Sequence, residues 1–289
     1  MDFNTALGVK QPGGKVPFRY TALDGLLDIS LSIVLVVGML LVWNQWWTNV
    51  EGVQANEARQ AELHATFDDD IVSHPAPFGV ASDLGIPLDQ LRGGQAFARV
   101  MIPALNQYEE DHDWQFAAVR GVSNAALLGG LGWYPQTQLP GANGNFVVAG
   151  HRDGRGAPFY HIDKLRPCDA IVVETATEWL TYRVLPVSGQ GDKVEQAKAC
   201  MPAAQTAAVA PLGAYHEMEG YRIIHPRENF VLAPVPSDVY IPADDAAQSL
   251  LTITTCHPLY ENKQRYIVSA MLTQRLGKSP GVVPDALKI

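Results

Sequence analysis

The sequence predicts a mostly β domain of short strands and a few short helices, preceded by one N-terminal transmembrane helix. The β prediction rests on short runs of β-branched and aromatic residues that recur from Gln95 onward, with Gly and Pro between them. The clearest run is LLTITTC at Leu250–Cys256, where apolar residues alternate with threonine. The helix prediction rests on Leu26–Trp47, the one segment apolar enough to span a bilayer. Many short strands joined by turns favour a barrel.

The composition is that of an ordinary globular chain, with 47% hydrophobic and 18% charged residues. The formal net charge of −9 leaves no basic surplus to neutralise phosphates, so we expect no nucleic-acid partner. The sequence contains no internal repeat and no low-complexity run.

The anchor segment also predicts where the rest of the chain lies. Three tryptophans cluster at its C-terminal end, as expected for an aromatic belt at a membrane surface. Basic residues precede the segment and acidic residues follow it, so we expect a single-pass protein with a cytoplasmic N-terminus and an extracellular remainder. A buried core helix and a cleaved signal peptide are the alternatives. The segment is long for a signal peptide, and no clear small-x-small cleavage site follows it.

We divide the chain into five parts on this basis. They are a cytoplasmic tail (residues 1–20), a transmembrane anchor (21–47), an extracytoplasmic helix and linker (48–94), a β domain (95–276) and a C-terminal tail (277–289). The linker prediction follows from several Gly and Pro turns between Phe67 and Gly94.

Within the β domain the residue patterns predict a series of strands and three helical stretches. Strands are expected at Gln95–Leu105, Gln115–Gly121, Asn145–Ala149, Ala170–Thr175, Trp179–Val187, Tyr221–Ile224, Asn229–Leu232, Leu250–Cys256 and Arg265–Leu272. Helical structure is expected at Ser123–Leu131, Ala157–Leu165 and Lys193–Ala210, the last broken by Pro202.

Three residues predict a site for thiol chemistry. Cys256 is the last residue of one expected strand and Arg265 the first of the next, so neighbouring strands would bring a thiol and a guanidinium to one rim of the sheet. His151 lies in a glycine-flanked turn after an expected strand, where a side chain is presented rather than packed. A histidine there can exchange protons with a leaving group. Taken singly, each residue is more often structural: a core cysteine, a surface histidine and a solvated arginine.

Two motifs resemble the sortase family. LTITTC followed by His257-Pro258 and Arg265 is similar to the sortase TLxTC…R signature. Gly144–Asp169, GNFVVAGHRDGRGAPFYHIDKLRPCD, resembles the segment that carries the sortase histidine, and Gly132-Trp133-Tyr134-Pro135 followed by LPG is similar to the region upstream of it. The resemblance covers roughly Gln95 to Gln274, and the AGHR and TTCHP motifs are most similar to those of the actinobacterial class E branch. It implies a closed sortase-type β-barrel.

The resemblance also implies an activity and a role for each matching residue. The protein would be a cysteine transpeptidase that cleaves an LPxTG- or LAxTG-like sorting signal between Thr and Gly and transfers the surface protein to the cell wall of a Gram-positive bacterium. Cys256 would form the thioester, His151 would move protons, and Arg265 would hold the substrate backbone or its oxyanion. Thr255 would help position the substrate, whereas His257 is expected to be structural. The implied partners are sorting-signal proteins and a peptidoglycan precursor or another amine acceptor, with no cofactor and no metal.

The sequence departs from the family pattern at two places. Cys168 stands where relatives usually carry glycine in LRPGD. Pro186–Gly220 is expected to be an insertion. The sequence does not show where it lies relative to the substrate groove, which it could cover or widen. If Cys256 stays a free thiol, Cys168 and Cys200 remain in an oxidising setting. They either form a disulfide that ties the insertion to the barrel or stay as two unpaired thiols, and the sequence leaves both alternatives open.

Three other functions compete with wall attachment. A pilin-polymerising sortase is less favoured because no DPx-type aromatic lid is evident, although Ser73–Phe78 could act as one. A non-catalytic, membrane-tethered binding module is disfavoured because all three site residues are present. A zinc site using Cys256, His257 and His151 is disfavoured because adjacent strand residues do not converge easily on one ion.

Overall fold

The computed structural model describes residues 26–44, 58–62, 93–109, 113–128, 130–154 and 156–288. The chain forms two compact units, Met1–Trp47 and Thr48–Ile289. The predicted tail at 1–20, most of the predicted linker at 48–94 and the Ser73–Phe78 stretch lie outside the described residues. The first unit contains the apolar helix, which spans Leu26–Asn44. Its 19 residues, at 1.5 Å each, give about 29 Å, close to the thickness of a bilayer's hydrocarbon core.

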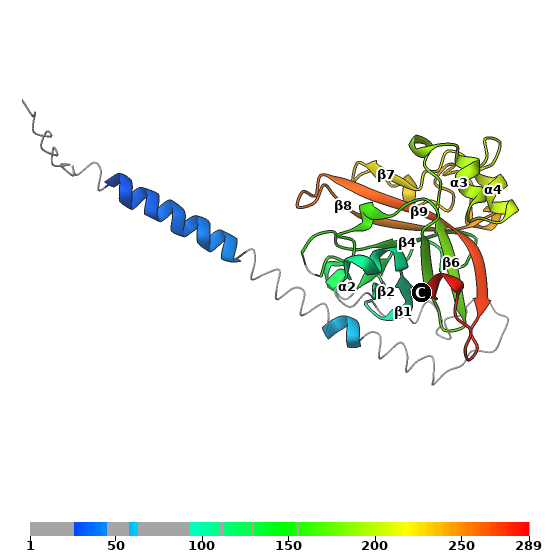
Figure 1. Ribbon diagram of the computed structural model, residues 1–289, viewed down its shortest axis with the longest axis horizontal. Coiled ribbons are helices and arrows are strands. Elements are labelled where there is room, and N and C mark those ends of the chain that lie inside the picture. The colour runs from blue at the N-terminus through cyan, green and yellow to red at the C-terminus, as the bar shows by residue number, and fades with distance from the viewer. Residues whose placement is uncertain are drawn as a thin grey trace, which may run out of the picture. The chain divides into compact units, whose positions relative to one another are not determined.

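The second unit is an eight-stranded barrel with one added strand (Figure 1). The barrel order is β6-β5-β1-β2-β3-β4-β8-β9, and a β6–β9 pairing closes it. β7 pairs with the first part of β9 outside this ring. The strands are β1 (Ala96–Met101), β2 (Gln115–Arg120), β3 (Leu131–Trp133), β4 (Gly144–Ala149), β5 (Ala170–Glu174), β6 (Glu178–Val184), β7 (Tyr221–Ile224), β8 (Ser249–His257) and β9 (Gln264–Gly277). The predicted closed barrel with short helices is therefore confirmed.

Four predicted elements are wrong in part. The run expected at Gln95–Leu105 turns after β1 into a 3-10 helix, η2 (Pro103–Tyr108), because Pro103 cannot donate to a strand ladder but fits the first helical turn. Asn229–Leu232 forms another 3-10 helix, η5 (Phe230–Leu232), instead of a strand. The helix α2 (Asn124–Leu128) ends early, and β3 follows where helix was expected. β9 continues past Leu272 because its second half pairs with β6.

Alternation along β8 divides its side chains between two sides of the barrel wall. Leu251 and Ile253 lie in the barrel core together with Phe146 and Val148 of β4. Leu250 belongs instead to a second apolar cluster with residues of the insertion. Thr252, Thr254 and Cys256 therefore share the outer face, whereas Thr255 and His257 lie on the inner face.

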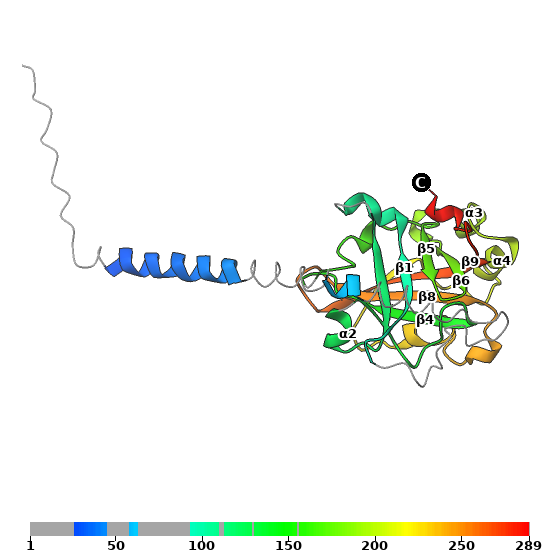
Figure 2. The ribbon, with the colours of Figure 1, turned by 90° about the horizontal axis from the view of Figure 1, so that it is seen from below.

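The insertion is a closed excursion on the outside of the barrel. The Gly220 N–H donates to the Pro186 carbonyl (2.9 Å), so its two predicted ends meet. It contains α3 (Lys193–Lys198) and α4 (Ala203–Val209), which lie together on the opposite side of the barrel from α2 (Figure 2). A disulfide joins Cys168 to Cys200, with 5.7 Å between their Cα atoms. Of the two alternatives for these cysteines, the bonded one is present.

Candidate active site

The ends of two parallel strands bring His151 and Cys256 to the same rim. β4 pairs with β8 in register from Gly144↔Ser249 to Ala149↔Thr254. His151 lies two residues after the last β4 partner, and Cys256 lies two residues after the last β8 partner. The carboxyl ends of parallel strands meet at one edge of a sheet, so the two side chains lie at matching positions.

A tight turn after β4 fixes the backbone at His151. Its carbonyl accepts a hydrogen bond from the Phe159 N–H (3.0 Å). Gly150 is required before it, because a Cβ atom at that position would lie 2.6 Å from the fully buried Phe159 ring. The glycine that flanks His151 therefore permits close packing of the turn against the barrel.

Antiparallel pairing brings Arg265 to Cys256. β8 and β9 pair Cys256 with Arg265 directly, as the sequence predicted for neighbouring strands. Asn262, in the loop between the strands, joins both side chains. Its Oδ1 accepts from Cys256 Sγ (3.2 Å) and from Arg265 Nη1 (2.5 Å). Sequence reasoning did not identify Asn262, because nothing in the motif shows that the loop folds back over the thiol.

Opposing influences act on the half-buried thiol of Cys256, which is a free cysteine. Burial raises its pKa, and the negative charge of Asp153 adds to this, whereas the Arg265 and Arg152 guanidinium groups lower the pKa. Burial dominates, so the pKa is above its ordinary value. The resting side chain is therefore a neutral thiol at neutral pH, consistent with its donating a hydrogen bond to Asn262.

Tyr134 lies at the same rim. It follows β3, and its N–H donates to the Val147 carbonyl (3.0 Å). Burial raises the pKa of its phenol, the Arg265 charge lowers that pKa, and a charge on Cys256 raises it. The phenol therefore responds electrostatically to both residues. It belongs to the Gly132–Pro135 motif, but the sequence offered no reason to assign it to the site.

Thr255 lies behind the rim, on the inner face of β8. Its side chain is buried, and its hydroxyl donates to the Gly150 carbonyl (2.7 Å). The hydroxyl thus links the residue before Cys256 to the residue before His151. Thr255 therefore lies on the opposite face of β8 from Cys256, and the expectation that it helps to position the substrate stays a prediction.

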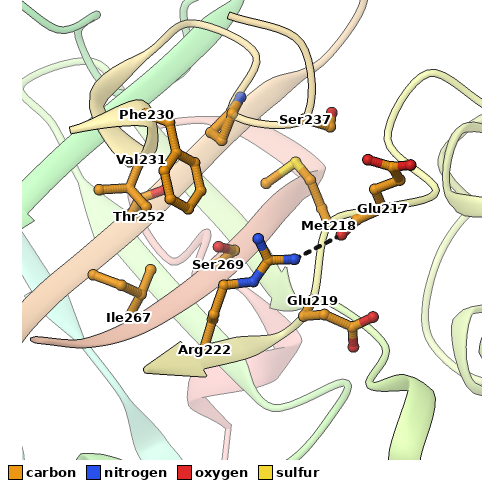
Figure 3. A pocket seen from close by; sticks show the side chains of 11 residues that line it. Glu217, Met218, Glu219, Arg222, Phe230, Val231, Ser237, Thr252, Ile267 and Ser269 are labelled. Carbon is orange, nitrogen blue, oxygen red and sulfur yellow. Dashed lines mark hydrogen bonds between the residues drawn. The ribbon is translucent and has the colours of Figure 1, made fainter. Parts of the chain in front are cut away.

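A pocket of about 260 Å³ lies on the outer face of β8 and β9 (Figure 3). By strand alternation, Cys256 faces the same side of β8 as the pocket residue Thr252. Thr252 forms part of its floor, four residues before Cys256 or about 13 Å along the strand. Apolar side chains from three elements surround it: Met218 of the insertion, Phe230 and Val231 of η5, and Ile267 of β9. The insertion therefore contributes one wall of the pocket.

Several polar contacts hold the walls of this pocket. Lys193 Nζ donates to the Met218 carbonyl (2.5 Å), which fixes the insertion wall. Arg222 of β7 donates to the Glu217 carbonyl (3.0 Å), as the dashed line in Figure 3 marks. Asn145 of β4 donates to the Val231 and Ala233 carbonyls (2.8 and 3.0 Å) and fixes the η5 wall.

The geometry also bears on the zinc alternative. His257 lies on the opposite face of β8 from Cys256, and its Nδ1 is hydrogen-bonded to Arg152 Nη1 (2.6 Å). The adjacent pair therefore diverges instead of converging on one ion. Within the described ranges, no group of three or more His, Cys, Asp or Glu side chains could hold a metal.

Comparisons with known proteins agree with this geometry. Residues 102–273 match the sortase domain. Sortase SrtE2 of Streptomyces coelicolor is 28% identical over 253 residues, covering 86% of this chain and 80% of that protein. Sortase SrtE1 of the same organism is 27% identical over 286 residues, covering 96% of this chain but only 63% of that protein. The solved SrtF sortase from Corynebacterium diphtheriae is 42% identical with a TM-score of 0.64, covering 69% of this chain and 95% of that chain.

Proposed function

The chain belongs to the sortase family, and we propose that it is a membrane-anchored cysteine transpeptidase acting on an LPxTG- or LAxTG-like sorting signal. The observation that carries this proposal is the meeting of His151, Cys256 and Arg265 at the ends of β4, β8 and β9. A nucleophile, a proton carrier and a fixed cation at one rim are the groups that acyl transfer through a thioester needs.

The proposed reaction has two halves. His151 takes the proton of the neutral Cys256 thiol, the resulting thiolate attacks the carbonyl carbon of the threonine, and Arg265 stabilises the oxyanion. The Thr–Gly bond then breaks, His151 gives its proton to the departing glycine amine, and a thioester remains on Cys256. An incoming amine attacks the thioester, His151 takes the amine proton, and the new amide leaves with Cys256 released. Every bond broken in the sorting signal is replaced, so no cofactor is required.

The pocket is in a suitable position to bind the leucine at the start of the sorting signal. An extended peptide rises about 3.3 Å per residue, so a leucine three residues before the scissile threonine would lie about 10 Å from Cys256. That distance falls between Ile267 and Thr252 along the outer face. The apolar lining suits a leucine side chain. On this proposal, replacing the leucine by serine raises KM more than it lowers kcat.

The apolar helix supports the anchoring part of the proposal. Leu26–Asn44 would cross the cell membrane with the basic N-terminal segment in the cytoplasm, and the barrel would act outside. Protease added to intact, wall-stripped cells should then degrade the barrel. Protection of the barrel would mean that the orientation is inverted.

The test of the activity uses the full chain in detergent with a sorting-signal peptide and diglycine. Wild type should release the C-terminal glycine fragment and form the diglycine adduct, both seen by mass spectrometry. Cys256→Ala should do neither, because a methyl group cannot form the thioester. His151→Ala should lose several orders of magnitude in rate, and Arg265→Lys should lose much of the rate because lysine lacks the planar fork. Peptide cleavage by the Cys256→Ala variant would contradict the proposal.

A further inference from the structure

A buried arginine closes the inner side of the catalytic rim. The Arg152 side chain is only 4% exposed. It donates to His257 Nδ1 (2.6 Å), pairs with Asp163 Oδ1 (3.2 Å), and lies over the Tyr266 ring at 5.1 Å. A buried guanidinium is costly unless its donors are used. Nη1 and Nη2 have these partners, which come from separate parts of the barrel, whereas the buried Nε has no hydrogen-bond partner among the described residues.

Arg152 and His257 are the chain neighbours of the two site residues that the contact would align. Arg152 directly follows His151, and His257 directly follows Cys256. The Thr255 hydroxyl and the Gly150 carbonyl form a similar link between the residues that directly precede the same pair. Two hydrogen bonds therefore flank His151 and Cys256 along the chain. One joins the residues that directly precede them, and the other joins the residues that directly follow them.

We propose that the Arg152–His257 bridge is a positioning device that fixes His151 relative to Cys256 for proton transfer. The β4–β8 pairing ends at Ala149 and Thr254, so the ladder between these two strands does not extend to His151 and Cys256, and Cys256 is paired with β9 instead. A displacement of about 1 Å between reacting groups can cost on the order of 100-fold in rate. The bridge removes that freedom without touching substrate. This inference rests on the proposed function and assigns a role to two residues outside the catalytic pair.

The bridge requires a neutral His257. Arginine has only donors, so Nδ1 must accept and the ring proton must lie on Nε2. Burial and the Arg152 charge lower the pKa of His257, while Asp163 raises it. Tyr266, whose ring lies 5.8 Å from the His257 ring, stays neutral because burial raises its pKa to about 12. Protonation of His257 in acid would turn the acceptor into a donor and break the bridge.

The test measures kcat and KM for five variants of the full chain in detergent, with a sorting-signal peptide and diglycine. Arg152→Met and His257→Ala should each lower kcat about 10- to 100-fold with KM within about twofold of wild type, because positioning rather than binding is lost. The double variant should be no slower than either single variant. His257→Gln should stay within about threefold of wild type, since its amide oxygen can accept from Arg152. Arg275→Met, which removes an arginine paired with Glu178 far along β9, is the matched control and should leave kcat unchanged.

A pH series separates positioning from simple packing. The kcat of wild type should fall more steeply in acid than that of His257→Gln, because only wild type has an acceptor that protonates. Superimposable profiles, wild-type kcat in Arg152→Met, or additive losses in the double variant would each overturn the inference. If wild type shows no turnover, the proposed function fails instead. The bridge is then judged by alkylation of Cys256 with iodoacetamide at pH 7, which Arg152→Met and His257→Ala should slow at least threefold and His257→Gln should not.

Discussion

Removing the Cys168–Cys200 disulfide should destabilise the barrel unit substantially. The bond closes a loop with a sequence separation of 32 residues. In the chain-entropy treatment, a loop of that length restricts the unfolded chain by about 12 cal/mol/K, which is about 3.7 kcal/mol at 25 °C. A domain of this size loses about 2–4 °C in Tm per kcal/mol, so the expected fall is about 7–15 °C.

The backbone at Cys168 allows a sharper version of this prediction. Its φ is +75°, a left-handed conformation that costs a residue with a Cβ about 1–2 kcal/mol and costs glycine almost nothing. Cys168→Gly with Cys200→Ala should therefore be about 1 kcal/mol more stable than Cys168→Ala with Cys200→Ala. Both pairs lack the bond, so the difference isolates the backbone. The same conformation gives a physical reason for the glycine that relatives usually carry at this position.

The assay is thermal unfolding of the full chain in detergent, followed by near-ultraviolet circular dichroism. A Cys256→Ala background prevents exchange with the free thiol. Mass spectrometry after alkylation without reductant should find neither Cys168 nor Cys200 modified. A Tm change below about 2 °C, or both cysteines alkylated before reduction, would refute the reasoning. Equal stability of the glycine and alanine pairs would refute only the backbone part.

Two further predictions concern the site and the pocket wall. Alkylation of Cys256 by iodoacetamide should accelerate as pH rises through 8 and 9, because burial raises the thiol pKa; Arg265→Gln should move that profile to still higher pH, and a profile centred below pH 7 would contradict the assignment of a neutral thiol. Asn145→Ala should lower the free energy of unfolding by about 2–3 kcal/mol, measured by urea titration, because it leaves two loop carbonyls and the Thr252 hydroxyl without their buried partner. A loss below about 0.5 kcal/mol would mean that water replaces the amide.

The elements that the sequence predicted well have strong local patterns. The alternation in LLTITTC and the proline at position 258 define β8 almost to the residue. The pairing of Cys256 with Arg265 follows from a short loop between consecutive strands. β3 was missed because its three residues are too short to show a period, and its parallel pairing with β2 is invisible in local sequence. The strand expected at Asn229–Leu232 was wrong because an apolar run of three residues, Phe230–Leu232, does not distinguish a strand from a 3-10 turn.

The same reasoning explains which site residues were found. Cys256, His151 and Arg265 stand at strand ends within motifs, so their type and position identify them. Asn262 and Arg152 lie outside the strands and act through contacts with strand residues that only the folded chain brings together. In the sequence, only their closeness to the motif residues points to them: Arg152 directly follows His151, and Asn262 lies three residues before Arg265.

The Asn262 contact connects the resting site to the proposed reaction. Its amide oxygen lies 3.2 Å from Cys256 Sγ and 2.5 Å from Arg265 Nη1. Arg265 can therefore donate to an oxygen that lies next to the sulfur, which is where the oxyanion of a carbon bonded to Sγ would develop. In the proposed reaction the substrate carbonyl would compete with the Asn262 amide oxygen for the Arg265 donor, so Asn262 would have to withdraw when a sorting signal binds. Withdrawal also removes the acceptor that stabilises the neutral thiol. Displacement of one loop side chain thus favours the thiolate at the moment when a carbonyl is in place to be attacked.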